Sequence, residues 1–156
     1  MLPITIPGFG DFNLTDAIID YNGTLAVDGT LITGITEPLN ELSKLLEIHI
    51  VTGDGFGTAK EELANINCKL TIIPADNQAI SKQKYLHQLN PKTTVAIGNG
   101  KNDCYILKES ALGIAILGEE GLCVEALLSA HVILPSIALA LELLHKPRRL
   151  KATLRT

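Results

Sequence analysis

The chain has 156 residues, of which 46% are hydrophobic and 19% are charged, and its formal net charge is −4. A chain of this length can bury a full hydrophobic core, so we expect a single domain over residues 1–156. The acidic balance argues against a general attraction to nucleic acid or to an anionic membrane surface. The three cysteines are widely spaced and odd in number, which indicates reduced thiols.

Two apolar segments are candidates for targeting or membrane signals. The first seven residues lack the basic region and the long apolar run of a signal peptide. The late apolar stretch, residues 134–144, is interrupted by Ser136 and Glu142 and is too short to span a bilayer. We therefore expect a cytoplasmic protein with no membrane partner.

The first half of the chain alternates predicted strands and helices. Residues 2–6 predict a short strand, residues 7–10 a turn, and the apolar end of residues 13–19 a buried strand that stops at Asp20. A turn-rich segment follows. Thr36 with an early proline predicts the start of a helix, and residues 48–52 predict the next strand. The expected buried stripe of the helix is Leu39, Leu42, Leu45 and Leu46.

The alternation continues to the end of the chain. Thr58 and Glu61 resemble a capping box that starts a helix running through Ala64. The later strands are expected at residues 70–73, 93–97, 112–117 and 131–134, and the later helices at residues 79–89, from about 102, at 122–128 and from 135. This order predicts an α/β fold with three layers, in which a doubly wound, Rossmann-like parallel sheet is covered by helices on both faces.

Polar residues follow several of the predicted strands. In a doubly wound sheet the carboxyl ends of the strands lie along one edge, so Asp20, Thr52, the residues before Lys82 and the segment 98–103 are expected to meet there. Asp20 can attack a phosphoryl group, Thr52 can donate a hydrogen bond, and Lys82 or Lys84 can neutralise charge. An Asp that only caps a turn is the simpler interpretation of Asp20 taken alone.

These motifs resemble those of the haloacid dehalogenase (HAD) superfamily over nearly the whole chain. Asp20-Tyr21-Asn22-Gly23-Thr24 resembles its first motif, Thr52-Gly53-Asp54 its second and Gly98-Asn99-Gly100-Lys101-Asn102-Asp103 its fourth. Three further features, Thr58-Ala59, Lys82 and Gly113-Ile114-Ala115, lie among these motifs. The order of all of them along the chain is similar to the order of their counterparts in the phosphorylation domain of P-type ATPases. The chain therefore looks like a soluble, stand-alone hydrolase related to that domain.

The resemblance implies a Mg²⁺-dependent phosphatase that works through an aspartyl phosphate. It implies catalytic roles for Asp20, Thr52 and Lys82, with Lys84 as the alternative lysine. The implied phosphate-binding residues are Gly23, Thr24 and Gly53, and the implied metal ligands are Asp20, Asn22, Asn99 and Asp103. The gaps between the motifs leave no room for the cap domain that many members carry, so we expect an open site.

Two residues depart from the superfamily pattern. Asn22 replaces the usual acid/base Asp, and because an amide cannot transfer that proton, hydrolysis should be slower by up to about 10²–10⁴-fold. Asn99 replaces the first Asp of the fourth motif and removes one negative charge, which should weaken Mg²⁺ binding. Asp28 and Asp54 are nearby compensating carboxylates or, more simply, turn residues.

The departures leave a second function open. The alternative is a non-catalytic phosphate- or Mg²⁺-binding relative that works as an oligomeric regulator. An uncapped site suits either a large phosphorylated substrate or cover by a neighbouring subunit, so a homo-oligomer is expected. The basic segment 146–156 is interpreted as a solvated tail or a complement to a helix end, with a subunit contact or a polyanion patch as the alternative. Binding of nucleic acid has the least support.

Overall fold

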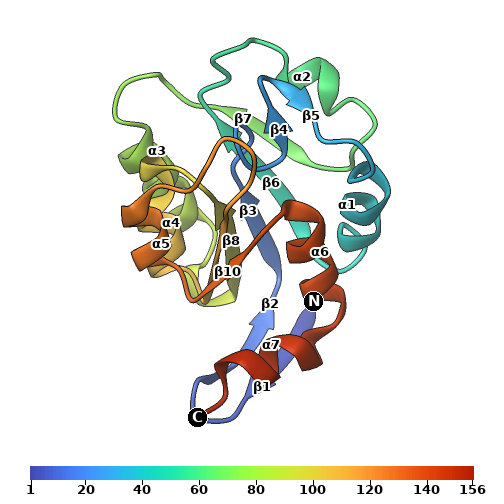
Figure 1. Ribbon diagram of the computed structural model, residues 1–156, viewed down its shortest axis with the longest axis vertical. Helices are drawn as coiled ribbons and strands as arrows, with labels where there is room; N and C mark the ends of the chain where they lie inside the picture. Colours follow the sequence, from blue (N-terminus) through green and yellow to red (C-terminus); the bar gives the residue numbers. More distant parts are fainter.

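A six-stranded, wholly parallel sheet forms the centre of the computed structural model, which describes residues 1–156 (Figure 1). Its strand order is β10-β9-β8-β3-β6-β7. The chain starts in the middle, moves outward on one side and then crosses to the other, so the predicted doubly wound fold is confirmed. The strands are β3 (Asp16–Ile19), β6 (Glu47–Thr52), β7 (Lys69–Ile72), β8 (Thr94–Gly98), β9 (Leu112–Ile116) and β10 (Val132–Leu134).

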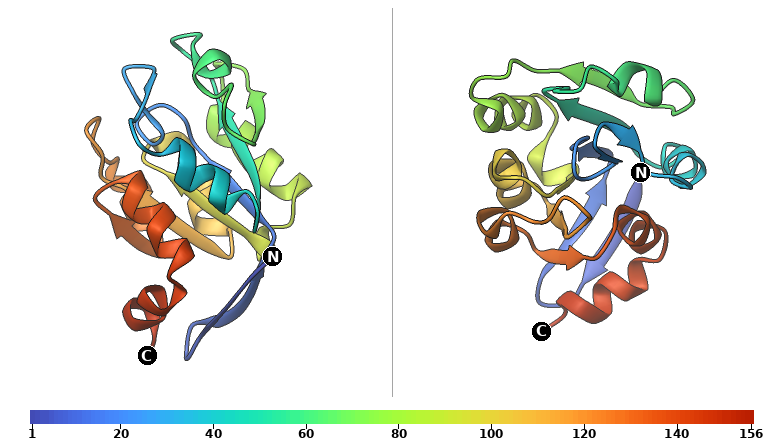
Figure 2. Two further views of the ribbon diagram at one scale, coloured as in Figure 1. Left: turned by 90° about the vertical axis from the view of Figure 1, so that its right-hand side faces the viewer. Right: turned by 45° about the horizontal axis from the view of Figure 1, so that its top comes forward.

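Helices cover both faces of this sheet, as Figure 2 shows. One face packs against α1 (Thr36–Leu42) and α6 (Ile137–His145), and the other against α3 (Gln78–Gln88), α4 (Cys104–Glu109) and α5 (Val124–Ser129). Strand residues alternate between the two cores: Ala17 and Ile19 face the first, and Ile18 faces the second. Burial on both faces explains why the central strands read as continuous apolar runs.

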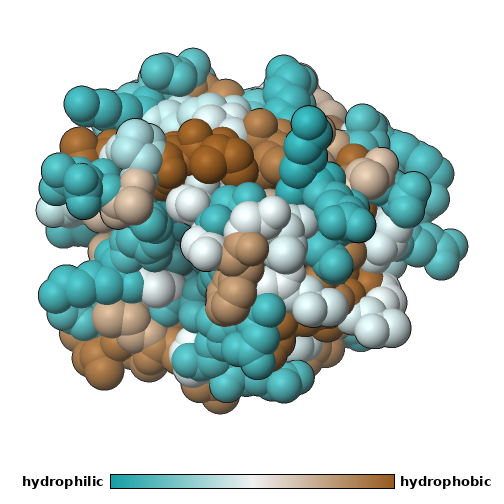
Figure 3. Space-filling model, turned by 90° about the horizontal axis from the view of Figure 1, so that it is seen from above, coloured by the Kyte–Doolittle hydropathy of each residue, from teal (hydrophilic) through white to brown (hydrophobic).

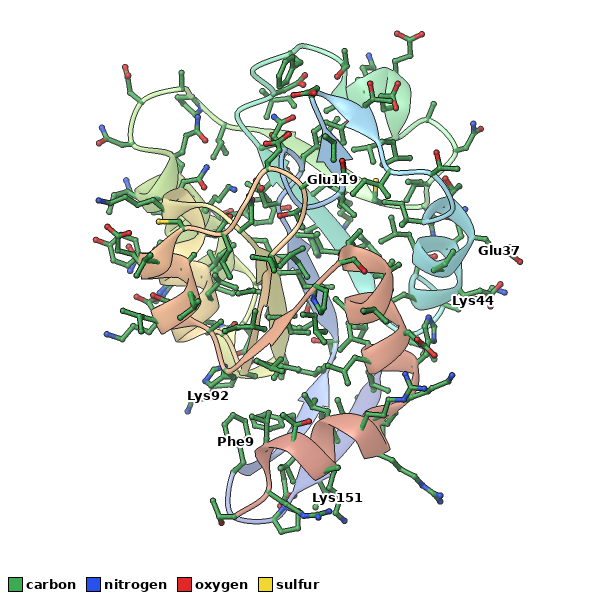
Figure 4. The ribbon with its side chains drawn as sticks, in the orientation of Figure 1. Phe9, Glu37, Lys44, Lys92, Glu119 and Lys151 are labelled. Carbon is green, nitrogen blue, oxygen red and sulfur yellow. The ribbon has the colours of Figure 1, made fainter.

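A hairpin and a last helix extend from the foot of the molecule in Figure 1. The hairpin strands β1 (Leu2–Ile6) and β2 (Gly10–Leu14) pair antiparallel, and β2 leads into β3 through Thr15. The expected buried strand at the apolar end of residues 13–19 is β3, whereas residues 13–14 belong to β2, a strand that was not expected. The basic segment forms helix α7 (Pro147–Leu154), whose buried Leu150 packs in the main core. Figure 4 shows Lys151 on this helix. The expectation of a solvated tail was wrong, because the helix has an apolar side to bury.

The connections are short, and none forms a cap domain. Between β3 and β6 the chain makes only the small hairpin of β4 (Ala26–Val27) and β5 (Thr30–Leu31), followed by α1. This hairpin occupies the segment that was expected to be only a turn. The remaining elements are the short helix α2 (Ala59–Glu62) and the 3₁₀ turns η1 (Pro91–Thr93) and η2 (Lys101–Asp103). No helix combines the length and apolarity needed to cross a membrane.

Three local predictions were wrong in detail. The hydroxyl of Thr58 does not cap α2 but donates to the carbonyl of Gly29 at 2.6 Å. Leu45, expected in the buried stripe, is exposed because α1 ends at Leu42. Ile80, expected on the buried side of α3, is also exposed. In this helix the inward positions are taken by Lys82 and Leu86.

Candidate active site

The predicted site residues gather at the carboxyl edge of the sheet. Asp20 directly follows β3, Thr52 ends β6, and the loop after β8 leads into η2. Figure 3 looks down on this edge, where hydrophilic and near-neutral residues cover much of the surface. The loop after β9 borders it, and Figure 4 shows Glu119 on that loop. The neighbouring Glu120 accepts a hydrogen bond from the N–H of Asp28, which ties this loop to the β4–β5 hairpin.

A buried ion triad lies under the centre of this edge. The Lys82 ammonium donates to Asp20 Oδ1 at 2.5 Å and to Asp103 Oδ1 at 2.7 Å. The side chains of Lys82 and Asp103 are fully buried, and that of Asp20 is 7% exposed. Lys84, the alternative lysine, is exposed on the outer side of α3. The structure therefore brings Lys82, and not Lys84, to Asp20.

The triad is unbalanced in charge, since two carboxylates share one ammonium. Burial, and next the nearby Asp103 carboxylate, raise the pKa of Asp20 to about 6, although Lys82 acts in the opposite direction. Burial lowers the pKa of Lys82, but the Asp103 and Asp20 carboxylates outweigh it and leave that pKa above its usual value. Lys82 thus stays charged, whereas burial makes the ionisation of Asp20 less favourable.

Asp103 also organises the loop after β8. Its Oδ2 accepts hydrogen bonds from the N–H groups of Asn99 at 3.1 Å and Gly100 at 2.9 Å. A Cβ on Gly98 would lie 2.4 Å from Asp103 Cγ, so only glycine fits there. Since both its oxygens already accept hydrogen bonds and it does not line the cleft described below, Asp103 is placed to hold Lys82 and the loop; direct metal ligation by it stays a prediction.

The turn after Asp20 uses its own N–H groups. Gly23 N–H donates to the carbonyl of Ala26 at 2.8 Å, and Thr24 N–H donates to that of Tyr21 at 3.2 Å. The structure therefore does not offer these two predicted phosphate-binding N–H groups to a ligand, because the tight turn consumes them. Thr24 instead places its hydroxyl 3.3 Å from Asp20 Oδ2.

The turn after β6 is arranged differently. Asp54 N–H donates to Thr52 Oγ1 at 3.0 Å, which leaves the hydroxyl hydrogen of Thr52 free to donate elsewhere. The N–H of Gly53 has no acceptor within the protein. Asp54 Oδ1 accepts from the N–H groups of Thr58 and Ala59, each at 3.1 Å, and so caps α2. Asp54 thus has a turn and capping role, and a role as a compensating carboxylate stays a prediction.

A cleft of about 270 Å³ opens above these groups, and none of its lining residues is hydrophobic. The Oδ1 atom of Asn22 is buried there without a hydrogen-bond partner. Asn99 lies beside it, with its Oδ1 3.3 Å from the hydroxyl of Thr24. Oxygen atoms over an unbalanced carboxylate pair fit a hard cation such as Mg²⁺. The lining residues are Asp20, Asn22, Thr52, Gly53, Asp54, Gly55, Gln78, Asn99, Gly100 and Asn102.

Gln78 also lines the cleft and was not among the predicted site residues. Its Oε1 accepts a hydrogen bond from Asn102 at 2.8 Å, and a Cβ on Gly53 would lie 2.6 Å from its Nε2. Gln78 therefore links the turn after β6 to the loop after β8. The signal that could have found it is its position four residues before Lys82, since residues i and i+4 share a face of a helix.

Comparison with known proteins places this geometry among described folds. No protein-family model matches the chain. An uncharacterised protein of Methanocaldococcus jannaschii, MJ0073, is 43% identical over 83 residues, which span 51% of this chain and 89% of that protein. Similar folds occur in solved structures of hydrolases, including phosphatases.

Three of these structures illustrate the likeness. The 3-deoxy-D-manno-octulosonate 8-phosphate phosphatase of Moraxella catarrhalis, solved with magnesium, phosphate and KDO, has a TM-score of 0.71 at 15% identity over 86% of this chain and 87% of that chain. The cobalt-bound deoxy-D-mannose-octulosonate 8-phosphate phosphatase of Haemophilus influenzae has a TM-score of 0.70 at 10% identity over 92% of this chain and 94% of that chain.

The third is a haloacid dehalogenase-like protein of Streptococcus pneumoniae, with a TM-score of 0.60 at 16% identity over 83% of this chain and 98% of that chain. All three identities are low, so the likeness is one of fold. The chain therefore belongs to the same family as the archaeal protein MJ0073 and has the fold of the haloacid dehalogenase superfamily, without a cap domain.

Proposed function

We propose that this protein is a Mg²⁺-dependent phosphohydrolase that transfers a phosphoryl group to Asp20 and then to water. The observation that carries the proposal is the buried Asp20–Lys82–Asp103 triad, whose Asp20 lines a cleft that has no hydrophobic lining residue. A nucleophilic carboxylate needs a cationic neighbour and an approach for its substrate, and Asp20 has both. A phosphatase of similar fold was solved with magnesium and phosphate ions, which supports the same use of this cleft.

The proposed Mg²⁺ ligands are the Asp20 carboxylate, the carbonyl oxygen of Asn22 and the Asn99 amide oxygen. Asp103 would contribute mainly its charge, because it does not line the cleft, as Asp20 does, and its oxygens hold Lys82 and the loop backbone. When bound, Mg²⁺ would neutralise part of the negative charge on the transferring phosphoryl group. It would also favour the ionised form of Asp20, whose pKa burial raises to about 6.

The chain's own groups account for the rest of the reaction. A carboxylate oxygen of Asp20 attacks phosphorus, the bond from phosphorus to the leaving oxygen breaks, and that oxygen takes a proton from solvent. Thr52 donates its free hydroxyl hydrogen to a phosphoryl oxygen, and the N–H of Gly53 supplies a second donor. Water then attacks phosphorus, releases inorganic phosphate and restores the Asp20 carboxylate.

The second half of this reaction should be slow. Asn22 occupies the position from which a carboxyl group would protonate the leaving oxygen and later activate the water, and its amide does neither. General acid–base catalysis contributes about 10²–10⁴-fold, so the aspartyl phosphate should persist. The unpartnered Oδ1 of Asn22 at the cleft also favours the second candidate, a phosphate- or Mg²⁺-binding regulator without turnover.

The substrate class follows only in part from the open cleft. With no cap over the edge, the phosphorylated substrate either is large or is covered by a second subunit of a homo-oligomer. The basic surface of α7 lies away from the cleft, at the foot of the molecule, so it is not proposed as part of substrate binding (Figure 1).

The test is single-turnover labelling and steady-state phosphate release with acetyl phosphate and a small aryl phosphate. Wild type is compared with Asp20→Asn, Asn22→Asp and the control Asn65→Asp, which makes the same chemical change at an exposed site. We expect slow release by wild type and by the control, and no labelling of Asp20→Asn. Asn22→Asp should release phosphate faster by up to about 10²–10⁴-fold.

Two outcomes would count against the hydrolase. Labelling that survives Asp20→Asn would exclude Asp20 as the nucleophile. Wild type that neither labels nor turns over at any Mg²⁺ concentration would favour the regulator, and phosphate binding by calorimetry would then be the measurement that supports it.

A further inference from the structure

A second cluster of ligand-type side chains lies at the opposite, amino-terminal edge of the same sheet. Asp16 and Glu47 are the first residues of β3 and β6, and they are direct partners in the parallel register. His49 follows Glu47 by two residues, so all three side chains point to the face that α3 covers. One ligand atom from each of the three lies within 4.8 Å of the others.

The imidazole of His49 is held in a defined orientation. Its side chain is 2% exposed, and Nε2 lies 3.1 Å from Asp16 Oδ1 and 3.4 Å from Glu47 Oε2. The other ring nitrogen, Nδ1, is 2.9 Å from the hydroxyl of Tyr85 on α3. Nε2 is therefore the nitrogen that faces the carboxylates.

Hydrogen bonds from neighbouring residues also hold the Asp16 carboxylate and the Tyr85 hydroxyl in place. Thr15 donates to Asp16 Oδ2 at 2.6 Å, which leaves Oδ1 turned toward the imidazole. Thr71 Oγ1 lies 3.5 Å from the hydroxyl of Tyr85. Metal-binding histidines and carboxylates are commonly held by such outer hydrogen bonds, which set the tautomer and the aim of each ligand.

The charges at this edge favour a cation. Two carboxylates directly opposite each other on neighbouring strands repel. Lys69, on β7, forms an ion pair with Glu47 Oε1. Its side chain is 60% exposed, and it forms no ion pair with Asp16. A neutral imidazole carries a single N–H hydrogen, so Nε2 donates to at most one of the two facing carboxylate oxygens. The point between Asp16 Oδ1, Glu47 Oε2 and His49 Nε2 is thus short of positive charge.

We propose that Asp16, Glu47 and His49 bind a divalent transition cation of the Zn²⁺ type. One imidazole nitrogen with carboxylate oxygens suits Zn²⁺, Co²⁺ or Ni²⁺ better than Mg²⁺, which prefers oxygen ligands alone. With the cation on Nε2, the ring hydrogen resides on Nδ1 and donates to Tyr85. The Glu47 side chain is 49% exposed, so one of the three ligands is open to solvent.

This site is separate from the catalytic edge. The three ligands sit where β3 and β6 begin, whereas Asp20 and Thr52 sit where these strands end. A cation there would join the first residues of two central, neighbouring strands. We therefore assign it a stabilising role, and its binding does not depend on phosphatase activity.

Calorimetric titration with Zn²⁺ in excess Mg²⁺ tests the assignment, because Mg²⁺ competes for the oxygen-lined catalytic cleft. Wild type should bind one Zn²⁺, and its melting temperature should rise with Zn²⁺ by mass action. Glu47→Gln and His49→Gln should lose both effects, while Tyr85→Phe should weaken binding by about 10–100-fold. Titration with Co²⁺ should give a visible absorption band in wild type that Glu47→Gln lacks.

The matched control is His87→Gln. His87 pairs with Glu109 at 2.7 Å on the exposed side of α3 and has no second carboxylate, so this variant should bind Zn²⁺ as wild type does. Because His49 is buried, its variant is checked by circular dichroism, and the half-exposed Glu47 carries the test if His49→Gln does not fold. The proposal is overturned if folded wild type does not bind Zn²⁺, or if Glu47→Gln binds it as tightly as wild type. Loss of Zn²⁺ in Asp20→Asn instead would place the ion in the catalytic cleft and would also overturn it.

Discussion

Replacing Asp20 by Asn should make the folded protein more stable while abolishing phosphoryl transfer. The side chain is almost fully buried, and burial raises its pKa from the ordinary 3.8 to about 6. An acid whose pKa is higher in the folded than in the unfolded state holds its proton longer when folded. Between pH 3.8 and about 6 the unfolded chain therefore binds fewer protons, and stability falls as the pH rises.

The size of this effect follows from the shift. A rise of roughly 2 pK units at about 1.4 kcal/mol per unit gives about 3 kcal/mol of stability lost once the pH exceeds the folded pKa. Asparagine has nearly the same shape as the carboxyl group and no charge. Asp20→Asn should thus be more stable than wild type by about 3 kcal/mol at a pH of about 8, and the difference should vanish below a pH of about 4.

Urea unfolding followed by circular dichroism at several pH values, without Mg²⁺, measures this difference. The control is Asp76→Asn, which removes an exposed carboxylate and should change little. Added Mg²⁺ should reduce the difference in unfolding free energy between Asp20→Asn and wild type, because a cation in the cleft stabilises the ionised form of Asp20 in wild type. If Asp20→Asn is no more stable than wild type at a pH of about 8, Lys82 compensates the buried carboxylate fully, and the charge imbalance inferred for the triad is wrong.

Three further substitutions test the ion triad, the capping of α2 by Asp54 and the attachment of α7 to the core. Lys82→Met should destabilise the protein by about 3–5 kcal/mol in urea unfolding, since it leaves two buried carboxylates without a cation, whereas the exposed Lys84→Met should stay within about 0.5 kcal/mol. Asp54→Ala should cost about 1 kcal/mol by removing the acceptor for the first N–H groups of α2, and an unchanged unfolding midpoint would show that this cap is dispensable. Leu150→Ala should cost about 2–5 kcal/mol in thermal unfolding, because this fully buried side chain holds α7 to the core; a smaller loss would mean that α7 is held by other contacts.

Much of the fold was predictable because its signals are local. Continuous apolar runs bounded by Gly and Asp identified the central strands, and their alternation with helical patterns indicated a parallel sheet. The elements that were missed are the β4–β5 hairpin and β2. Both lie in short, mixed segments where neither a period of two nor one of 3.6 residues can be established. Cap positions were the least predictable, since the hydroxyl of Thr58 found a better acceptor in Gly29, which lies on another loop.

By itself, the sequence determined which residues stand at the ends of the strands, because strand ends and polar turns are encoded by neighbouring residues. It could not decide between Lys82 and Lys84, since that choice depends on which side of α3 packs against the sheet. Nor could it show that the Gly23 and Thr24 amides are consumed by their turn. The meeting of Asp16 with Glu47 and His49 depends on the register between β3 and β6, a property of two segments far apart in the chain. Such contacts form only when the whole sheet is assembled, so the tertiary structure alone decided them.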